Sequence, residues 1–266
     1  MSSPIQNYAS ILRILLFGSS GKGKSSAANT FINQFEEFGL EMKAEVREEE
    51  EIEQKTVKLN SYSMTDCIKI FDILGWNPNY YTVEKFDNII NGKVEENQDL
   101  RDKKLEIKKQ ANPLSNMDVV IFVINKDVLT DKYLEALKDY YEFAKKSKLL
   151  FFLLTKVDQF KTVEPLYNSP DKEDNVKKIK TAVVQSNEFK SICKFVRQII
   201  PEANILPMIN YAKDDYPSAI QKHFTDSVFD FIFKNVEKKE TKKESTFDIF
   251  KNETDIIWKL HYDGSI

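Results

Sequence analysis

Residues 18–25 place glycine, lysine and serine at the spacing of a phosphate-binding loop. They read Gly18-Ser19-Ser20-Gly21-Lys22-Gly23-Lys24-Ser25, a complete G-x-x-x-x-G-K-S pattern. Glycines let the backbone turn tightly enough for several N–H groups to point at phosphate oxygens. We expect Lys24 to reach the β- and γ-phosphates and the Ser25 hydroxyl to bind Mg²⁺. The pattern predicts that a nucleoside polyphosphate is bound by Gly18, Ser20, Gly21, Lys22, Gly23, Lys24, Ser25 and Ser26.

A second motif of the form D-x-x-G follows at Asp72-Ile73-Leu74-Gly75. Its aspartate would hold a water on Mg²⁺, and the N–H of Gly75 would sense the γ-phosphate. Thr56 follows an acidic stretch, residues 48–53, and precedes an expected strand, so it is the candidate switch threonine. The predicted metal residues are Ser25, Asp72 and Thr56, and the predicted catalytic residues are Lys24, Thr56 and Gly75.

A third motif, Thr155-Lys156-Val157-Asp158, closes an apolar run and predicts the base. A carboxylate at Asp158 accepts hydrogen bonds from N1–H and the 2-amino group of guanine, whereas adenine offers neither donor there. The stem of Lys156 would lie over the base plane. After the last expected strand, a backbone N–H near Asn210 would meet the guanine carbonyl. The predicted nucleotide is therefore GTP or GDP, and the base-binding residues are Thr155, Lys156, Asp158, Asn210 and Tyr211.

The motifs also have purely structural interpretations. Residues 18–25 could form a glycine-serine turn between a strand and a helix, and Asp158 could cap a helix. The apolar run Ile11 to Phe17 before the first motif, and the helix-forming residues after it, favour nucleotide binding.

Apolar strands alternate with helical segments along the chain. Strands are expected at residues 11–17, 56–63, 67–73, 118–124, 149–154 and 203–209, and helices from residue 26 and at 83–109, 128–146, 174–199 and 217–235. This alternation predicts an α/β fold with a doubly wound, mostly parallel sheet and helices on both faces, of the P-loop NTPase type that GTPases share. Ligands of such sheets bind outside the carboxyl ends of the strands, where all the motifs fall.

Length and composition fit one large nucleotide-binding domain. The chain has 266 residues, of which 41% are hydrophobic. We expect an N-terminal extension at 1–10, a GTPase-like domain at 11–236, and a charged linker with a C-terminal appendage at 237–266.

Charge and cysteine content bear on partners and compartment. The net charge of −3 gives no reason to expect nucleic acid as a partner. Cys67 and Cys193 lack metal-binding spacing, which favours a reducing compartment. No apolar run approaches the length of a transmembrane segment. We therefore expect a cytoplasmic protein.

Beyond the general GTPase pattern, the chain resembles the interferon-induced protein 44 family over about residues 10–236. The segments that match are Ile14 to Ser26, Phe31-Ile32-Asn33, Asp72 to Gly75, Ile89 to Val94, Val119 to Ile124, Leu154 to Asp158 and Asn210-Tyr211. The resemblance implies a cytosolic guanine-nucleotide-binding protein. The chain differs from many GTPases at Trp76, because an indole stands where those proteins carry a glutamine that orients the attacking water.

These features favour a slow, Mg²⁺-dependent GTPase that acts as a switch or scaffold. GTP would promote self-association or binding of a protein partner through residues 47–60 and 75–90. One alternative is a protein that holds GTP or GDP without hydrolysing it. Another is a small-molecule or nucleotide kinase, whose arginine-bearing lid is hard to build from only four arginines, which are Arg13, Arg47, Arg101 and Arg197.

Overall fold

The computed structural model describes residues 11–34, 44, 56–102, 105–129, 133–169, 171–172, 174–210 and 218–240, with the side chains of 237–240 excepted. The expected N-terminal extension, the acidic stretch at 48–53 and residues 241–266 lie outside this part of the chain. The last described helix, α7, spans Ala219–Glu240 and so continues past the expected domain boundary at residue 236.

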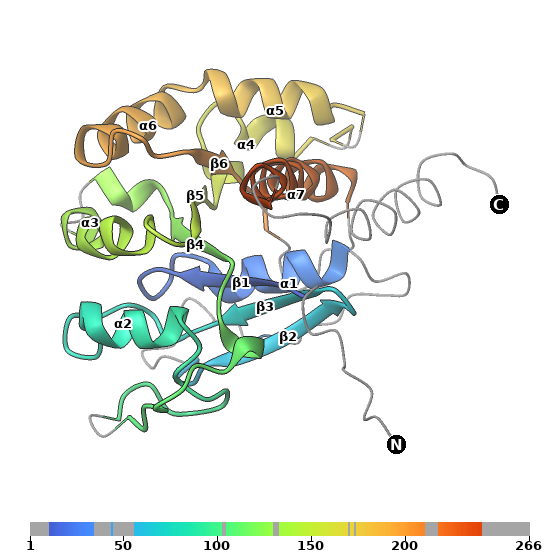
Figure 1. Ribbon diagram of the computed structural model, residues 1–266. Coiled ribbons are helices and arrows are strands. Elements are labelled where there is room, and N and C mark those ends of the chain that lie inside the picture. Colours follow the sequence, from blue (N-terminus) through green and yellow to red (C-terminus); the bar gives the residue numbers. More distant parts are fainter. Residues whose placement is uncertain are drawn as a thin grey trace.

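Six strands form one sheet through the middle of the molecule (Figure 1). They are β1 (Leu12–Phe17), β2 (Asn60–Thr65), β3 (Ile68–Asp72), β4 (Val119–Ile124), β5 (Leu149–Leu154) and β6 (Ile205–Pro207). Their order across the sheet is β2-β3-β1-β4-β5-β6, and only the pairing of β2 with β3 is antiparallel. The predicted α/β fold with a mostly parallel sheet is confirmed.

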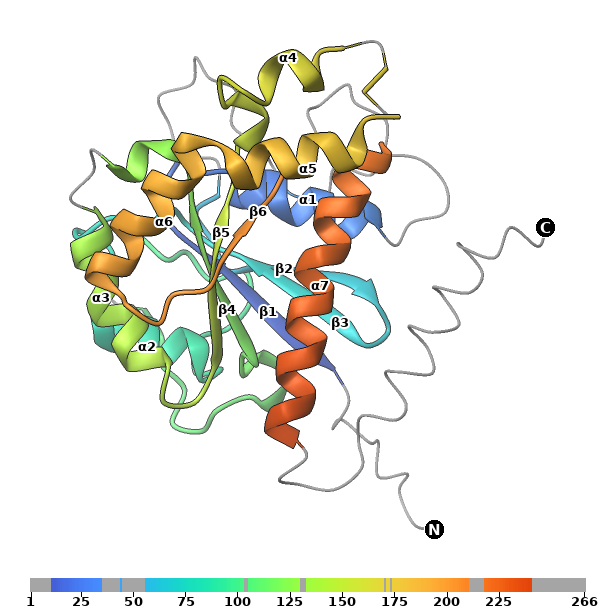
Figure 2. The same ribbon diagram turned by 90° about the horizontal axis from the view of Figure 1, so that it is seen from above.

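Alternation along the strands sends their side chains to opposite faces of the sheet. In β1, Ile14 and Leu16 join one apolar cluster, whereas Leu15 and Phe17 join the other. The first cluster is covered by α1 (Lys24–Gln34) and α7. The second is covered by α2 (Val83–Ile90), α3 (Tyr133–Ala144), α5 (Val176–Gln185) and α6 (Asn187–Ile199). Figure 2 shows this arrangement from above, with α2, α3 and α6 on one side and α7 on the other.

Both faces of β1 and β4 are therefore buried, which explains why these strands read as continuous apolar runs. Short turns of helix lie in the connections: η2 (Pro113–Ser115) precedes β4, η3 (Lys126–Leu129) follows it, and η4 (Val157–Gln159) and α4 (Glu164–Tyr167) follow β5. Within the described residues, no helix is both long enough and apolar enough to cross a membrane.

The helix expected at 83–109 is much shorter in the structure. After α2 ends at Ile90, Gly92 takes a left-handed φ of 70°. A Cβ there would come within 2.5 Å of the Asn112 carbonyl oxygen, because the chain returns directly against this glycine. Beyond Gly92, residues 97–100 pair with residues 57–59 just before β2, where Leu100 N donates to Val57 O at 2.9 Å. The prediction was wrong because contacts distant in sequence decide the conformation of this segment.

The helix expected at 174–199 is divided in two by Ser186. This residue leaves the helical conformation with a ψ of 146° and begins α6 as its N-cap. Its hydroxyl accepts a hydrogen bond from Phe189 N and donates one to Val183 O, so it serves both helix ends. Smaller differences occur at α3, which begins at Tyr133 after η3, and at β2, which begins at Asn60.

We predict that Gly92→Ala destabilises the fold by about 2–4 kcal/mol, because alanine adds both left-handed strain and a clash with the Asn112 carbonyl. Urea unfolding followed by circular dichroism measures this loss. The matched control is Asn97→Gly, at a second left-handed position with a φ of 64°, which should change stability by less than about 0.5 kcal/mol. Equal midpoints for the wild type and the Gly92 variant would contradict the argument.

Candidate nucleotide-binding site

The predicted phosphate loop lies between the end of β1 and the start of α1. Gly21 and Gly23 have φ values of 74° and 90°, a left-handed conformation that glycine adopts without steric cost. A Cβ on Gly23 would also lie 3.1 Å from both Thr155 Oγ1 and Asn210 Nδ2. The backbone therefore favours glycine at both positions; the motif prescribes Gly23, whereas Gly21 stands at one of its unspecified positions.

The Lys24 ammonium lies buried beneath this loop. Lys24 is 6% exposed, and its Nζ donates to the Ser19 carbonyl oxygen at 3.2 Å. Burial lowers the pKa of Lys24, and the nearby Asp72 carboxylate opposes that shift. A buried ammonium with donors to spare is suited to an anion, and it lies where the motif places the phosphates.

Ser25, Thr56 and Asp72 come together although they lie far apart in sequence. Ser25 Oγ donates to Asp72 Oδ2 at 2.7 Å, and Thr56 Oγ1 lies 3.3 Å from Ser25 Oγ and 3.4 Å from Asp72 Oδ2. Hydroxyl and carboxylate oxygens are the donors that Mg²⁺ prefers. The three residues predicted to hold the metal thus form one oxygen cluster beside Lys24.

Asp72 itself carries a sign of an absent ligand. It is fully buried, and its Oδ1 accepts no hydrogen bond from the residues that the structure describes. Burial raises the pKa of Asp72, while the Lys24 charge and the Ser25 hydrogen bond oppose the shift. A buried carboxylate oxygen without a donor is costly in the absence of a cation, so this donor set fits Mg²⁺.

The second motif packs directly on the phosphate loop. Trp76 N donates to Gly18 O at 2.8 Å, and a Cβ on Gly75 would lie 2.6 Å from Ser20 N. Only glycine fits at position 75, next to the expected phosphates. The Trp76 ring packs on Tyr133, with centroids 5.0 Å apart, so the indole is held by the aromatic residues of α3.

The base motif is tied to the same loop. Thr155, fully buried, donates through Oγ1 to the Lys22 carbonyl oxygen at 2.7 Å. Lys156 adopts a left-handed φ of 59°, and Asp158 is half-buried on η4. Asn210 Nδ2 lies 3.4 Å from Gly23 O, within reach of a weak hydrogen bond. Tyr211 lies outside the described residues. The structure thus brings Thr155 and Asn210 to the loop, and the roles of all these residues in binding guanine stay predictions.

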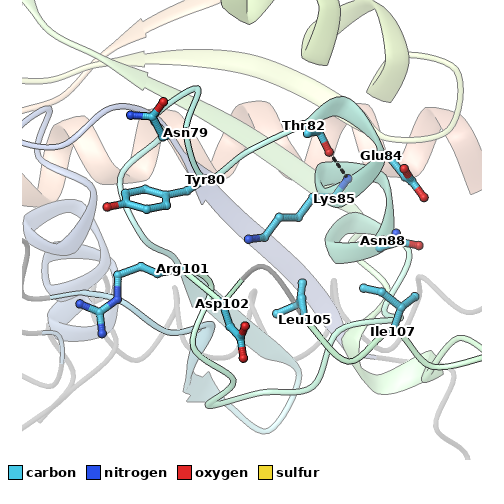
Figure 3. A pocket seen from close by; sticks show the side chains of 10 residues that line it. All are labelled: Asn79, Tyr80, Thr82, Glu84, Lys85, Asn88, Arg101, Asp102, Leu105 and Ile107. Atoms are coloured by element: carbon cyan, nitrogen blue, oxygen red, sulfur yellow. Dashed lines mark hydrogen bonds between the residues drawn. The ribbon is translucent and has the colours of Figure 1, made fainter.

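A pocket lies between residues 79–82, α2, and the described residues 101–102 and 105–107 (Figure 3). Thr82 caps α2 at its entrance, accepting a hydrogen bond from Lys85 N at 3.1 Å. The Lys85 ammonium donates to the Leu100 carbonyl oxygen and lies over the Tyr81 ring. Tyr80 lines the pocket and is exposed. The pocket belongs to the surface that follows Gly75 in the chain.

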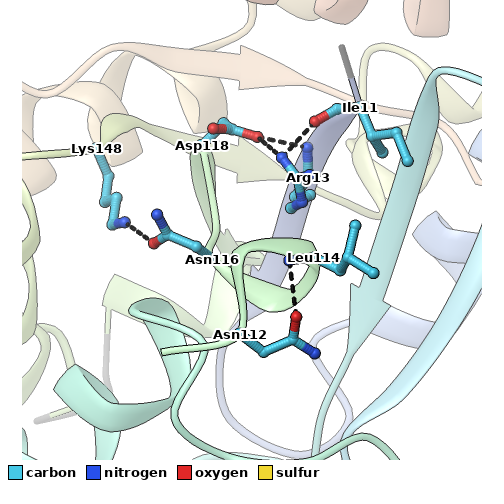
Figure 4. Close-up of polar contacts among 7 residues, drawn as sticks. All are labelled: Ile11, Arg13, Asn112, Leu114, Asn116, Asp118 and Lys148. Carbon is cyan, nitrogen blue, oxygen red and sulfur yellow. Dashed lines mark hydrogen bonds and ion pairs between the residues drawn. The ribbon is translucent and has the colours of Figure 1, made fainter. Parts of the chain in front are cut away.

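Arg13, one of the few arginines, lies at the opposite end of β1 from the phosphate loop (Figure 4). Its backbone N–H and its guanidinium both donate to Asp118 Oδ2, at 2.9 and 3.3 Å. Burial raises the pKa of Asp118, against the effect of Arg13. Close by, Lys148 Nζ donates to Asn116 Oδ1 at 2.8 Å. This arginine therefore supports the sheet and does not reach the nucleotide site.

Two residues of the site were missed in the sequence. Asn125 follows β4 and is 3% exposed, and Asp127 lies two residues later on η3. Lys22 Nζ lies 3.3 Å from Asp127 Oδ2, so the loop lysine is paired with an acid from the neighbouring strand end. The signal available was their position: polar residues directly after a buried strand whose carboxyl end faces the ligand.

The family model described as 50S ribosome-binding GTPase matches residues 13–156, which is more than half of the chain. No curated protein matches the chain.

Solved structures that resemble the chain include two of Toc33 from Arabidopsis thaliana. One, a dimerisation-deficient mutant, is 15% identical with a TM-score of 0.40, and the match covers 83% of this chain and 82% of that one. The complex of Toc33 with Mg²⁺ and GMPPNP is 14% identical with a TM-score of 0.39, covering 83% and 85%. From the family match, which spans the phosphate loop, the second motif and the start of the base motif, we conclude that this chain belongs to the 50S ribosome-binding GTPase family.

Proposed function

We propose that this GTPase-family chain is a slow, Mg²⁺-dependent guanine-nucleotide switch or scaffold. The observation that carries the proposal is the cluster of Ser25, Thr56 and Asp72 beside the buried Lys24, with Asp72 Oδ1 left without a donor among the described residues. When bound there, Mg²⁺ would neutralise phosphate charge. The N–H groups of the loop and the Lys24 ammonium would orient the phosphates. The residues that bury Asp72 would keep water away from its carboxylate.

Selectivity for guanine would come from Asp158. Its carboxylate follows β5 on η4, next to Lys156, and Thr155 joins this motif to the phosphate loop. Because the Thr155 hydrogen bond holds the base motif against the phosphate loop, a bound nucleotide would have to span a set distance from its phosphates to its base and present a set edge of that base to Asp158. An adenine base would leave the carboxylate without its two donors.

We predict that Asp158→Asn weakens GDP binding by at least about tenfold, because a charge-assisted pair of hydrogen bonds is lost. The same variant should gain affinity for XDP, since the asparagine amide can donate to the 2-carbonyl of xanthine. Competition titrations with GDP, XDP and ADP measure both effects. Asp139→Asn, an exposed acid on α3, is the control for net charge. Undiminished GDP affinity would contradict the assignment of Asp158.

Hydrolysis should be slow because the described residues of the site offer no group that orients the attacking water. The position after Gly75 is Trp76, whose indole packs on Tyr133. Of the arginines that the structure describes, Arg101 pairs with Asp99 and Arg197 donates to Ala203 O. With Arg13 bound to Asp118, none of these three guanidiniums is directed to the phosphates.

We predict well under about one turnover per second for the isolated chain at low concentration. Trp76→Gln should not restore fast hydrolysis, because the neighbouring aromatic residues position a ring rather than a flexible amide. Single-turnover assays with radiolabelled GTP test both statements, with Lys24→Ala as the background control. Rapid hydrolysis by dilute monomer would refute the proposal of a slow enzyme.

The partner surface that we propose comprises residues 47–60 and 75–90. Its described part includes Thr56 at the metal cluster, Gly75 at the phosphate loop, and the pocket beside α2 (Figure 3). A ligand that attracts Thr56 and Gly75 would therefore reshape a surface that carries the exposed Tyr80. The cytoplasmic location and the likeness to the interferon-induced protein 44 family belong to the same proposal.

We predict that a non-hydrolysable GTP analogue increases the mass of the protein relative to GDP, and slows hydrogen exchange at residues 56–60 and 75–90. Light scattering and hydrogen-exchange mass spectrometry provide the measurements. If mass and exchange are the same with both nucleotides, the chain holds its nucleotide as a structural cofactor, and the switch is excluded.

A further inference from the structure

Lys22 lies in the part of the phosphate loop where the backbone is intrinsically least constrained. It stands between Gly21 and Gly23, both of which have left-handed φ values. Glycines allow many backbone conformations, so a loop built on them loses much conformational freedom when it is ordered around a ligand. Contacts that restrain Lys22 before binding therefore reduce the entropic cost of binding.

Lys22 is restrained both at its backbone carbonyl and at the end of its side chain. Its carbonyl oxygen accepts the 2.7 Å hydrogen bond from Thr155 Oγ1. Its side chain is only 10% exposed and ends at the Asp127 carboxylate, with Nζ 3.3 Å from Oδ2. The ammonium of Lys22 is thus directed to an acid of η3, and its expected contribution to the phosphates comes from the backbone.

Asp127 is itself held in place. Asn125 Nδ2 donates to Asp127 Oδ2 at 2.8 Å, and Asp127 N donates back to Asn125 Oδ1 at 3.2 Å. Burial alone would raise the pKa of Asp127, but the Asn125 hydrogen bond and the charges of Lys22 and Lys156 outweigh it and lower the pKa. The carboxylate is therefore ionised at neutral pH and interacts with lysines of both the phosphate loop and the base motif.

We propose that Asp127 is a positioning residue for nucleotide binding, which acts by holding Lys22 and so pre-organising the phosphate loop. This inference rests on the proposed guanine-nucleotide function and adds a residue to its site. The competing view treats Asp127 as a negative charge that repels phosphates. The two views predict opposite signs, because loss of the tether weakens binding whereas loss of the repulsion strengthens it.

The main experiment measures release of fluorescent GDP and of a fluorescent non-hydrolysable GTP analogue at low and high salt. Asp127→Asn and Lys22→Met should each accelerate release by about threefold to tenfold, since one half-exposed charged pair is removed. The acceleration should be equal for both nucleotides, because the loop contacts both. The double variant should release no faster than the single variants, as expected for one shared interaction.

Lys126→Met is the matched control, since this exposed lysine lies beside Asp127 on the same turn. It should leave release unchanged. Asp127→Asn alters a carboxylate whose side chain is 55% exposed, so it should fold normally even if Lys22→Met does not. Slower release from the Asp127 variant, larger for the GTP analogue and suppressed by salt, would establish repulsion and overturn the proposal. Unchanged release would also overturn it.

A second readout separates this inference from the proposed function. Hydrogen exchange at the amides of residues 20–24 in nucleotide-free protein requires no ligand, and it should be faster in Asp127→Asn than in the wild type. If the wild type binds no guanine nucleotide, the proposed function fails, and the exchange rates alone decide whether Asp127 restrains the loop. Equal exchange in the two proteins would exclude the tether.

Discussion

The fully buried carboxylate of Asp72 is the constraint on which the site depends. A carboxylate in this position is stable only if cations and donors surround it, because burial favours its neutral form. Lys24 and Ser25 supply those partners from the loop after β1, and they reach Asp72 because β1 and β3 are neighbours in the sheet, with Leu16 paired to Asp72. The strand order is thus a requirement of the chemistry as well as of packing.

The same requirement explains why so much of the fold could be predicted. Buried parallel strands are apolar over their whole length, and each motif directly follows such a run, so strand positions and the approximate place of the site follow from local patterns. Thr56 could be identified from its order in the chain. That it lies within 3.4 Å of Asp72 is a tertiary fact that no pattern supplies.

Elsewhere, contacts distant in sequence overruled local patterns. The periodicity of residues 83–109 suits a helix, yet the approach of Asn112 to Gly92 ends it at Ile90. Ser186 reads as an ordinary polar residue inside a helix until its hydroxyl is seen to serve two helix ends. Asn125 and Asp127 carry no recognised motif; their position after a buried strand points to the site, but the pairing of Asp127 with Lys22 is visible only in the structure. Contacts between residues that follow different strands cannot be inferred from a short stretch of sequence.

The hydrogen bond from Trp76 N to Gly18 O ties the residue after the second motif to the first residue of the phosphate loop. It extends the pairing of β1 with β3 beyond the ends of both strands, as the bridge between Ser19 and Trp76 shows. Any outward movement of residues 75 and 76 has to break this bond, whose net worth is about 1 kcal/mol. The second motif and the phosphate loop therefore move as one unit unless this bond breaks.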